Sequence, residues 1–460
     1  MQIKEFLNNV CEQIEYKLIT NEISEELENH IEETKANYIE NGIAENVAEE
    51  KAIEQMGDAI EIGKSLNKIH RPKLDWKLLI ITIIVLSFGL LVAITRNINY
   101  EVGLYEKGHE RLFNAPILFT ISCIIGIILS IGIYFSNYKK LQKYATITYI
   151  LATIIGIFIN SFGTIYIPIL SIRRQIPVTL PMFLYIIAFI GFLQNINENK
   201  DIIKLQIKIP ILNDFSVNIA KIVCLNIFSL IVMASESNAL ILGLSYLIIS
   251  TIKLLQIKEN RKKYITILWV VPTLLTCIYF CLYIGSVAHG GIIMNRLEAS
   301  FNPRIDPNGV GWISMQQERV INSAKLLGPE ENIGEAMQIF NQGTNQAFLS
   351  ILANYGWIVS LIMVATVIIF SAKLIIDAIK IRDLYGKLLI VGISSCFILQ
   401  SIFNLLMNFN LGVQMNINIP FISYDGFYLI INIIALTFIL SIYRRKDIVL
   451  SSNNVTMQEN

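Results

Sequence analysis

Ten long apolar runs constrain the fold of this 460-residue chain more than any other feature. A membrane whose apolar core measures about 30 Å needs roughly 20 apolar residues per helix. The sequence therefore predicts an all-α polytopic membrane protein with about ten transmembrane helices. The chain is 16% charged, against about 25% in soluble proteins, which also excludes a soluble globular enzyme. The runs cover approximately residues 76–95, 115–136, 143–162, 179–195, 215–234, 238–255, 264–286, 347–371, 387–410 and 420–443.

Charge is distributed unevenly along the chain. Residues 1–70 hold 16 acidic and 6 basic residues, a net of −10, and the remainder holds 20 acidic and 31 basic residues. If the N-terminus is cytoplasmic, 22 of those 31 basic residues fall on the cytoplasmic side and 9 on the other. Because cytoplasmic loops are enriched in Lys and Arg, both termini are predicted to be cytoplasmic in a multi-pass cell-membrane protein. The lipid bilayer is expected to surround the transmembrane helices. The overall net charge of +1 argues against a nucleic-acid partner.

The acidic segment 1–70 has its own helical pattern. Ser24, followed by two glutamates, is expected to cap a helix that ends at Gly42, and Gly57 is expected to end the next helix. We therefore predict a cytoplasmic helical prefix domain over 1–70, followed by a transmembrane domain over 71–460. Two interpretations of the prefix remain open, a solvated bundle and a docking or regulatory module. Its first helix is indicated by apolar residues at three- and four-residue steps: Ile3, Phe6, Leu7, Val10, Ile14 and Leu18.

One connection is far longer than its neighbours. Residues 287–346 join the seventh and eighth runs, and the charge pattern places this loop outside the cell. Connections of such length usually carry function. Asn302-Pro303, Asp306-Pro307 and the Gly-x-Gly-Trp segment that ends at Trp312 are expected to fix turns there.

The segment 420–426 reads Pro-Phe-Ile-Ser-Tyr-Asp-Gly, which resembles the PFISYGG signature of the shape, elongation, division and sporulation (SEDS) family. Members of that family include FtsW, RodA and SpoVE. Further similar features are Arg296 at the start of the long loop, Gly392 with Gln400 and Asn404, and the Ala-Asn-Tyr-Gly segment at 353–356. Residues 1–70 are similar to a helical prefix domain found ahead of some bacterial permeases.

The resemblance implies a function in peptidoglycan synthesis, with lipid II or another polyprenyl-pyrophosphate-linked sugar as substrate. It also implies a penicillin-binding transpeptidase-type membrane partner. A sugar hydroxyl would attack the anomeric carbon, which requires a base for the hydroxyl and cations for the pyrophosphate. The sequence has no cysteine and histidine spacing typical of a metal site, and no cofactor is expected. The residues expected to bind substrate are Arg296, Arg304, Arg319, Lys325, Ser423 and Tyr424.

The chain departs from the family pattern at three places. Asn345 stands where the family has its proposed catalytic aspartate, and an amide cannot accept the proton. The stretch 173–182 lacks the Glu and Lys that the family carries there. Asp425 replaces a glycine of the signature and is a candidate catalytic carboxylate. Catalytic activity therefore stays open, and the departures indicate a divergent member.

Three functional hypotheses follow. The first is an enzyme, or an enzyme-derived protein, of cell-wall synthesis that serves cell shape, division or sporulation. The second is a non-catalytic scaffold that keeps the fold and the partner surfaces. The third is a lipid or solute transporter, which ranks last because the sequence shows no internal repeat and few ionisable groups within the apolar runs.

Overall fold

The computed structural model of the chain describes residues 2–15, 20–70, 74–104, 115–162, 164–167, 172–175, 177–197, 214–233, 235–255, 302–329, 344–412 and 414–446, with residues 270, 298 and 340. The chain divides into two compact units. One contains residues 1–75 and 442–460, and the other contains residues 76–441.

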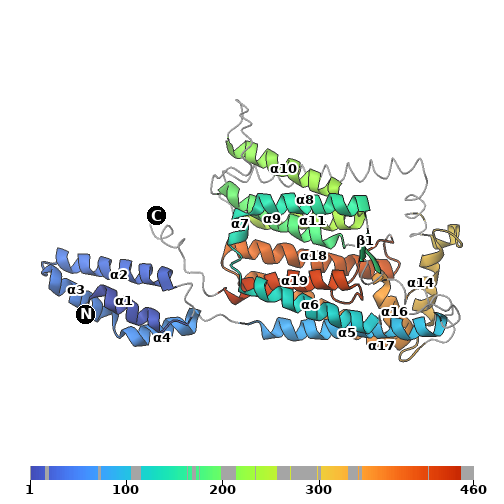
Figure 1. Cartoon of the computed structure of the whole chain (residues 1–460), viewed down its shortest axis with the longest axis horizontal. Helices are drawn as coiled ribbons and strands as arrows, with labels where there is room; N and C mark the ends of the chain where they lie inside the picture. The colour runs from blue at the N-terminus through green and yellow to red at the C-terminus, as the bar shows by residue number, and fades with distance from the viewer. Residues whose placement is uncertain are drawn as a thin grey trace. The chain divides into compact units, whose positions relative to one another are not determined.

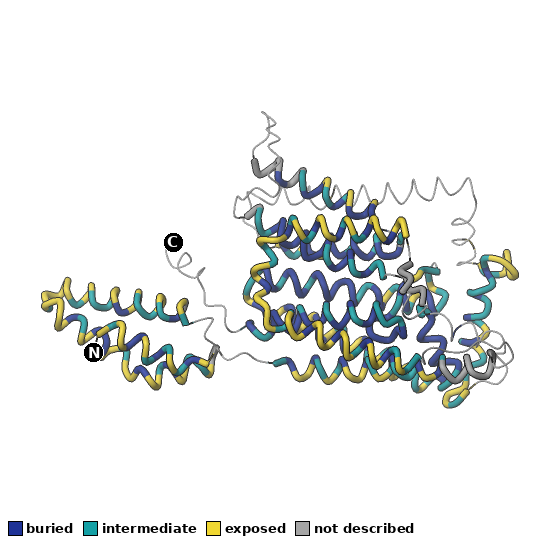
Figure 2. The backbone as a smooth tube through the Cα atoms, in the orientation of Figure 1, coloured by how far each residue is buried: buried dark blue, intermediate teal, exposed yellow. Residues whose placement is uncertain are grey.

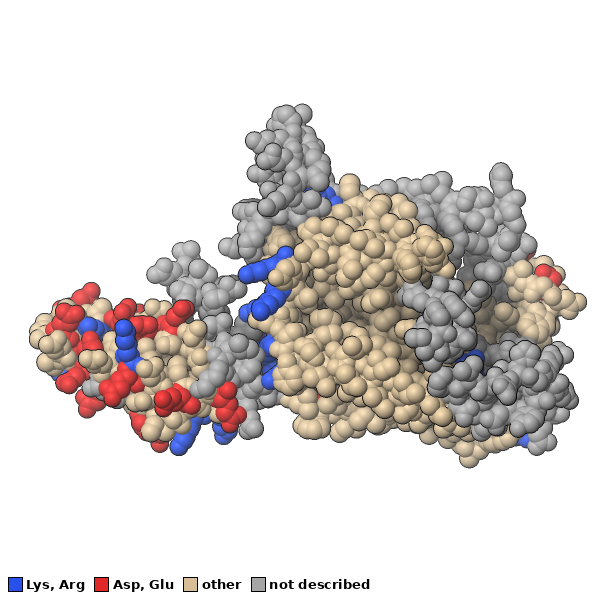
Figure 3. Space-filling view, in the orientation of Figure 1, with Lys and Arg blue, Asp and Glu red and all other residues tan. Residues whose placement is uncertain are grey.

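The N-terminal unit contains four helices around a small apolar core. Gly42 and Gly57 end helices as predicted, and both have positive φ angles, of 83° and 92°. The prediction that Ser24 begins a helix is wrong, because α2 already begins at Thr20 and brings Ile23 into contact with the core. Acidic side chains cover much of the visible face of this unit (Figure 3). The helices are α1 Ile3–Glu12, α2 Thr20–Glu40, α3 Glu45–Met56 and α4 Ala59–His70.

A charged contact joins two helices of this unit. Lys35 of α2 donates to Glu49 of α3 at 3.0 Å and lies 3.2 Å from Glu45. The hydrogen bonds to these two carboxylates raise the pKa of Lys35 above its ordinary value.

The larger unit is a helical bundle (Figure 1). Helices lie on every predicted apolar run except 264–286, of which the structure describes only residue 270. Among the described residues, six helices are long and apolar enough to cross a membrane, so the predicted count of ten stays a prediction. The helices are α5 Trp76–Leu104, α6 Ala115–Phe135, α7 Lys140–Lys143, α8 Ala145–Phe162, α9 Thr179–Asn197, α10 Asp214–Val232, α11 Glu236–Leu255, α14 Trp312–Ser323, α16 Ala347–Tyr355, α17 Trp357–Lys380, α18 Leu384–Asn408 and α19 Gly426–Arg444.

Four short elements lie in the connections. Strands β1 Thr164–Ile167 and β2 Ile172–Gln175 pair antiparallel between α8 and α9, a hairpin that the sequence analysis did not anticipate. The 3₁₀ turns η3 Pro303–Ile305 and η4 Thr344–Gln346 lie in the long loop, on either side of α14.

Helix α18 is the central element of the bundle. It packs against α9, α11 and α17, and most of its residues are buried (Figure 2). Gly392 permits the close approach of α9, because a Cβ atom at this position would lie 2.6 Å from a methyl group of Ile186. The centre of the bundle is therefore fixed by close packing between helices.

Helix α6 lies at the outside of the bundle. Its buried residues, Phe119, Ser122, Gly126 and Ser130, follow one another at three- and four-residue steps. Seven of its isoleucines are exposed, as on a helix that faces lipid: Ile117, Ile121, Ile124, Ile125, Ile127, Ile128 and Ile131. The helix is attached along this one narrow line of mostly small residues.

The eighth predicted run is two helices instead of one. Helix α16 ends at Tyr355 and α17 begins at Trp357, so the expectation of a single helix over 347–371 is wrong. Gly356 separates them with a φ of +85°, a conformation that favours glycine. A Cβ atom there would lie 2.7 Å from the backbone oxygen of Lys325. The segment that follows α14 packs directly against this break, where the backbone N–H groups of Trp357 and Ile358 donate to the backbone oxygens of Lys325 and Leu326.

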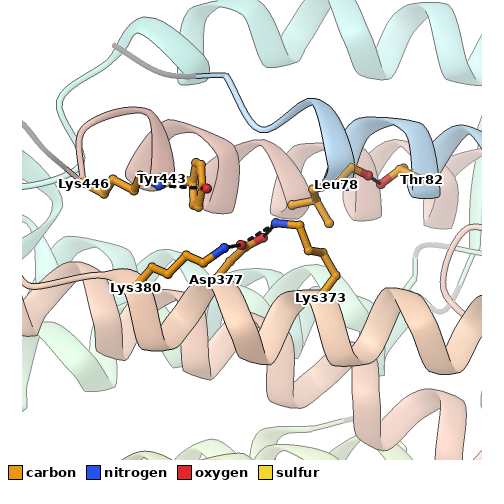
Figure 4. Close-up of polar contacts among 7 residues, drawn as sticks. All are labelled: Leu78, Thr82, Lys373, Asp377, Lys380, Tyr443 and Lys446. Atoms are coloured by element: carbon orange, nitrogen blue, oxygen red, sulfur yellow. Dashed lines mark hydrogen bonds and ion pairs between the residues drawn. The ribbon is translucent and has the colours of Figure 1, made fainter. Parts of the chain in front are cut away.

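An ion cluster is buried on α17 (Figure 4). The ammonium group of Lys373 hydrogen-bonds both carboxylate oxygens of Asp377, whose side chain is completely buried. Lys380 lies 3.8 Å from the same carboxylate and is about half exposed. One buried carboxylate thus contacts two lysines within a span.

Candidate functional site

The segment 420–425 is held by an aromatic cluster. Phe421 has a φ of +66°, which is unusual for a residue with a side chain. Its completely buried ring packs against Phe370 of α17 and Phe397 of α18, with ring centroids 5.6 Å and 5.4 Å away. Its backbone oxygen lies close to Gly89 of α5, where a Cβ atom would clash. The packing of this ring maintains a strained backbone directly before α19.

The next residues form a tight turn. The guanidinium group of Arg96 lies over the ring of Tyr424, 3.9 Å from its centroid. Ser423 is buried, and its hydroxyl accepts the backbone N–H of Asp425 at 3.2 Å. The carboxylate of Asp425 accepts the backbone N–H of Phe427 at 3.1 Å, and so caps the start of α19. Ser423 and Tyr424, both predicted to bind substrate, are thus engaged in shaping the turn.

Position 345 lies in a cluster of amide side chains. Asn345 donates from its side chain to the backbone oxygen of Met415 at 3.2 Å. Its own backbone oxygen accepts from Asn404 at 2.7 Å and from Asn408 at 3.1 Å. Asn404 also donates to the backbone oxygen of Ile417 at 2.6 Å. The cluster joins η4, α18 and the segment 414–425, and no carboxylate takes part in these hydrogen bonds among the residues that the structure describes.

A polar cavity of about 110 Å³ lies beside this cluster, where α9, α11 and α19 begin. Thr344, the neighbour of Asn345, contributes to its wall, as does Asp425. Among the twelve described residues that line it, Asp425 alone has a carboxylate, and none is a lysine or arginine. The lining residues are Pro177, Val178, Thr179, Ser235, Asn238, Thr344, Gln400, Asn416, Ile417, Asn418, Asp425 and Tyr428.

Several hydrogen-bonding groups in the cavity wall lack a full set of partners among the described residues. The hydroxyl of Tyr428 lies 3.1 Å from the side-chain oxygen of Gln400 and 2.9 Å from the backbone oxygen of Asn418. Its single proton can serve only one of them fully. Within the described part of the chain, Gln400 Nε2, Asn418 Oδ1 and Thr179 Oγ1 are buried without a hydrogen-bond partner. Buried polar atoms in this state are uncommon in native proteins, and a water, an ion or a bound ligand group can satisfy them.

The predicted cationic residues do not gather at this cavity. Arg304, Arg319 and Lys325 are exposed on the segment 302–329, and Arg304 lies 3.9 Å from a carboxylate oxygen of Glu318. Arg296 lies outside the described residues. Their binding of pyrophosphate stays a prediction. Asp425 and the neighbour of Asn345, by contrast, meet at one cavity.

Two kinds of residue at the site do not stand out in the sequence. Arg96 marks the end of the first apolar run, which is a weak sign of a function because many spans end in a cation. Thr179 and Asn238 are single polar residues at the edges of apolar runs and gave no pattern. Within the described residues, no three His, Cys, Asp or Glu side chains cluster as metal ligands would.

The bundle and its cavity define a polytopic helical membrane protein with a polar site where several spans begin. The chain belongs to the FtsW/RodA/SpoVE family of cell cycle proteins, whose family model matches residues 76–448. The match covers the membrane bundle and leaves the N-terminal helices outside it.

Curated relatives match over about a third of this chain. It is 25% identical to the probable peptidoglycan glycosyltransferase FtsW of Trichlorobacter lovleyi over 34% of this chain and 42% of that protein. It is 26% identical to the peptidoglycan glycosyltransferase RodA of Treponema pallidum, over 33% and 36%. The stage V sporulation protein E of Bacillus subtilis is 25% identical over 35% and 45%. The chain thus matches less than half the length of each.

Solved structures share the fold. A chain from a peptidoglycan synthase complex aligns with a TM-score of 0.55 at 14% identity, covering 81% of this chain and 98% of that chain. The rod shape determining protein RodA of Thermus thermophilus aligns with a TM-score of 0.50 at 13% identity, covering 81% and 97%. At these identities, the likeness concerns the fold.

Proposed function

We propose that this protein synthesises peptidoglycan strands by polymerising lipid II at the cavity beside α19. The observation that carries the proposal is the position of this polar cavity in a chain of the FtsW/RodA/SpoVE family, matched over 76–448. Relatives from three organisms bear the name peptidoglycan glycosyltransferase, two of them with the word probable.

The lining of the cavity suits a pyrophosphate-linked sugar. Hydroxyl and amide groups, such as those of Thr179, Asn238 and Gln400, can hydrogen-bond sugar hydroxyls. The N-terminal ends of α9 and α11 carry partial positive charge, because their first backbone N–H groups have no partner within the helix. An anionic pyrophosphate is therefore favoured there without a lysine or arginine in the wall.

The orientation of the chain in the membrane that we propose follows from the charge pattern. Both termini and the prefix domain 1–70 lie in the cytoplasm, and the loop 287–346 and the cavity face the outside of the cell. Basic side chains gather at the end of the bundle where α7 lies, which supports this orientation (Figure 3). The partner is a penicillin-binding transpeptidase, because a structural relative comes from a complex that coordinates polymerisation and crosslinking.

A second candidate function is a non-catalytic scaffold of the cell-wall machinery. Asn345 favours it, because its side chain is an amide that hydrogen-bonds the backbone of Met415 where the family pattern has a carboxylate. Under this hypothesis, the chain binds the transpeptidase and forms no glycan strands.

The decisive experiment is polymerisation of purified lipid II by the full-length chain in detergent. Strand formation by the natural chain supports the enzyme. Ser235→Trp, which places an indole ring in the cavity wall, is expected to reduce it at least tenfold. Ile128→Trp on α6 is the matched control, because Ile128 is 61% exposed on the outer helix. A natural chain that forms no strands but co-purifies with the transpeptidase supports the scaffold and overturns the enzyme.

A further inference from the structure

The reacting hydroxyl needs a proton acceptor, and position 345 does not supply one. The side chain of Asn345 is neutral at any pH compatible with folding, and its Nδ2 group donates to the backbone of Met415. Hydrogen bonds from Asn404 and Asn408 hold its backbone oxygen as well. The residue is therefore part of the frame of the cavity.

Asp425 lies where a carboxylate that replaces the one missing at position 345 has to lie, in the wall of the same cavity. It lines the same cavity as Thr344, the residue next to Asn345, although the two are 81 positions apart in the chain. It is the one carboxylate among the twelve lining residues. Any proton released inside this cavity has no other carboxylate in the described wall to accept it.

The surroundings of Asp425 keep its carboxylate in place. One of its oxygens accepts the N–H of Phe427, and its own N–H donates to Ser423. Gly426, the next residue, packs so closely on Ser122 of α6 that a Cβ atom would clash. The partial positive charge at the start of α19 stabilises the negative charge.

We propose that Asp425 is the general base of glycosyl transfer in this protein, an inference that rests on the proposed function. The acceptor sugar's hydroxyl oxygen forms a bond to the anomeric carbon of the lipid-linked donor. The bond from that carbon to the pyrophosphate oxygen breaks, and the pyrophosphate leaves with the electron pair. The hydroxyl proton moves to the Asp425 carboxylate.

The test is lipid II polymerisation by the purified full-length chain and its variants. Asp425→Asn is expected to reduce kcat by about 10²–10⁴-fold, the usual loss for a positioned base, with KM changed less than about threefold. Asp425→Glu should retain more activity than Asp425→Asn because it keeps the carboxylate. Glu61→Gln, which removes an exposed carboxylate of α4, is the control and should match the natural chain.

A second pair of variants keeps the inference testable if Asp425→Asn folds poorly. Asp425→Gly restores the glycine of the family signature and should be as inactive as Asp425→Asn. Asp425→Gly combined with Asn345→Asp should recover at least tenfold over Asp425→Gly alone. If Asp425→Asn or Asp425→Gly polymerises lipid II at the natural rate, the inference is overturned and the proposed function stands. If the natural chain makes no strands, both are overturned.

Discussion

The side chain of Asn404 donates to the backbone oxygens of Asn345 and Ile417, at 2.7 Å and 2.6 Å. One amide near the C-terminal end of α18 thus supports two separate segments that border the cavity. Backbone carbonyls in loops have no helix partner, so a buried side chain has to satisfy them. The shape of the cavity therefore depends on a residue that does not line it.

Asn404→Ala is expected to destabilise the bundle. It removes the hydrogen bonds to both backbone oxygens, so that the oxygen of Ile417 loses its donor and that of Asn345 keeps only Asn408, which should cost about 2 kcal/mol. The free energy of unfolding, measured by denaturant titration in mixed micelles, gives the result. Asn322→Ala on α14 removes an exposed amide and is the control. Equal stability of the two variants would contradict the role of Asn404.

Gly356→Ala and Gly328→Ala separate backbone strain from crowding. Both glycines have positive φ, of 85° and 86°, so each substitution should cost roughly 1–3 kcal/mol through the backbone. Gly328 has open space around it, whereas a Cβ atom at Gly356 would meet the backbone of Lys325 and Leu326. Gly356→Ala should therefore lower the midpoint of thermal unfolding further than Gly328→Ala does. The same midpoint for both variants would show that crowding is unimportant.

Gly426→Ala should be rescued by a change on another helix. The new methyl group would clash with the hydroxyl oxygen of Ser122, which α6 places beside the start of α19. We expect Gly426→Ala to destabilise the chain and Ser122→Ala, in the same chain, to restore part of the loss. A double variant no more stable than Gly426→Ala would refute this contact. Ser130→Ala, on the same face of α6, is the control for the second substitution.

Breaking the buried pair of Lys373 and Asp377 on α17 should lower the free energy of unfolding strongly, whereas replacing both residues by apolar ones should lower it little. Lys373→Met removes the nearer of the two lysines that contact the completely buried Asp377, and should cost about 3–5 kcal/mol. Replacing both, as Lys373→Met with Asp377→Leu, should recover most of that loss. A double-mutant cycle of unfolding free energies measures the coupling, and additive effects would mean that the pair is not coupled.

Apolar periodicity and glycine positions predicted most of the helices. Gly42 and Gly57 end helices where expected, because the left-handed region is accessible to glycine. The break at Gly356 was missed for a physical reason. Helix α16 is buried from Ala347 to Ala353 inside the protein, so its sequence is as apolar as that of a helix in lipid. Composition alone cannot distinguish these two surroundings.

The site was partly predictable. Asp425 stood out because it interrupts the family signature, and the structure places it at the cavity. The role of Asn404 in supporting Asn345 could not be read from the sequence, because the two are 59 positions apart and meet only through folding. Arg96 likewise finds Tyr424 across 328 positions.

Because α6 is attached along a narrow line, we expect the thickness of the surrounding membrane to affect the shape of the cavity. A helix of 21 residues extends about 32 Å, close to the width of a typical apolar core of about 30 Å. In a narrower bilayer such a helix tilts. The buried residues of α6 lie along one line, formed by Phe119, Ser122, Gly126 and Ser130. Ser122 on that line contacts Gly426, the neighbour of Asp425. Lipids with shorter acyl chains should therefore alter the cavity before they alter the centre of the bundle.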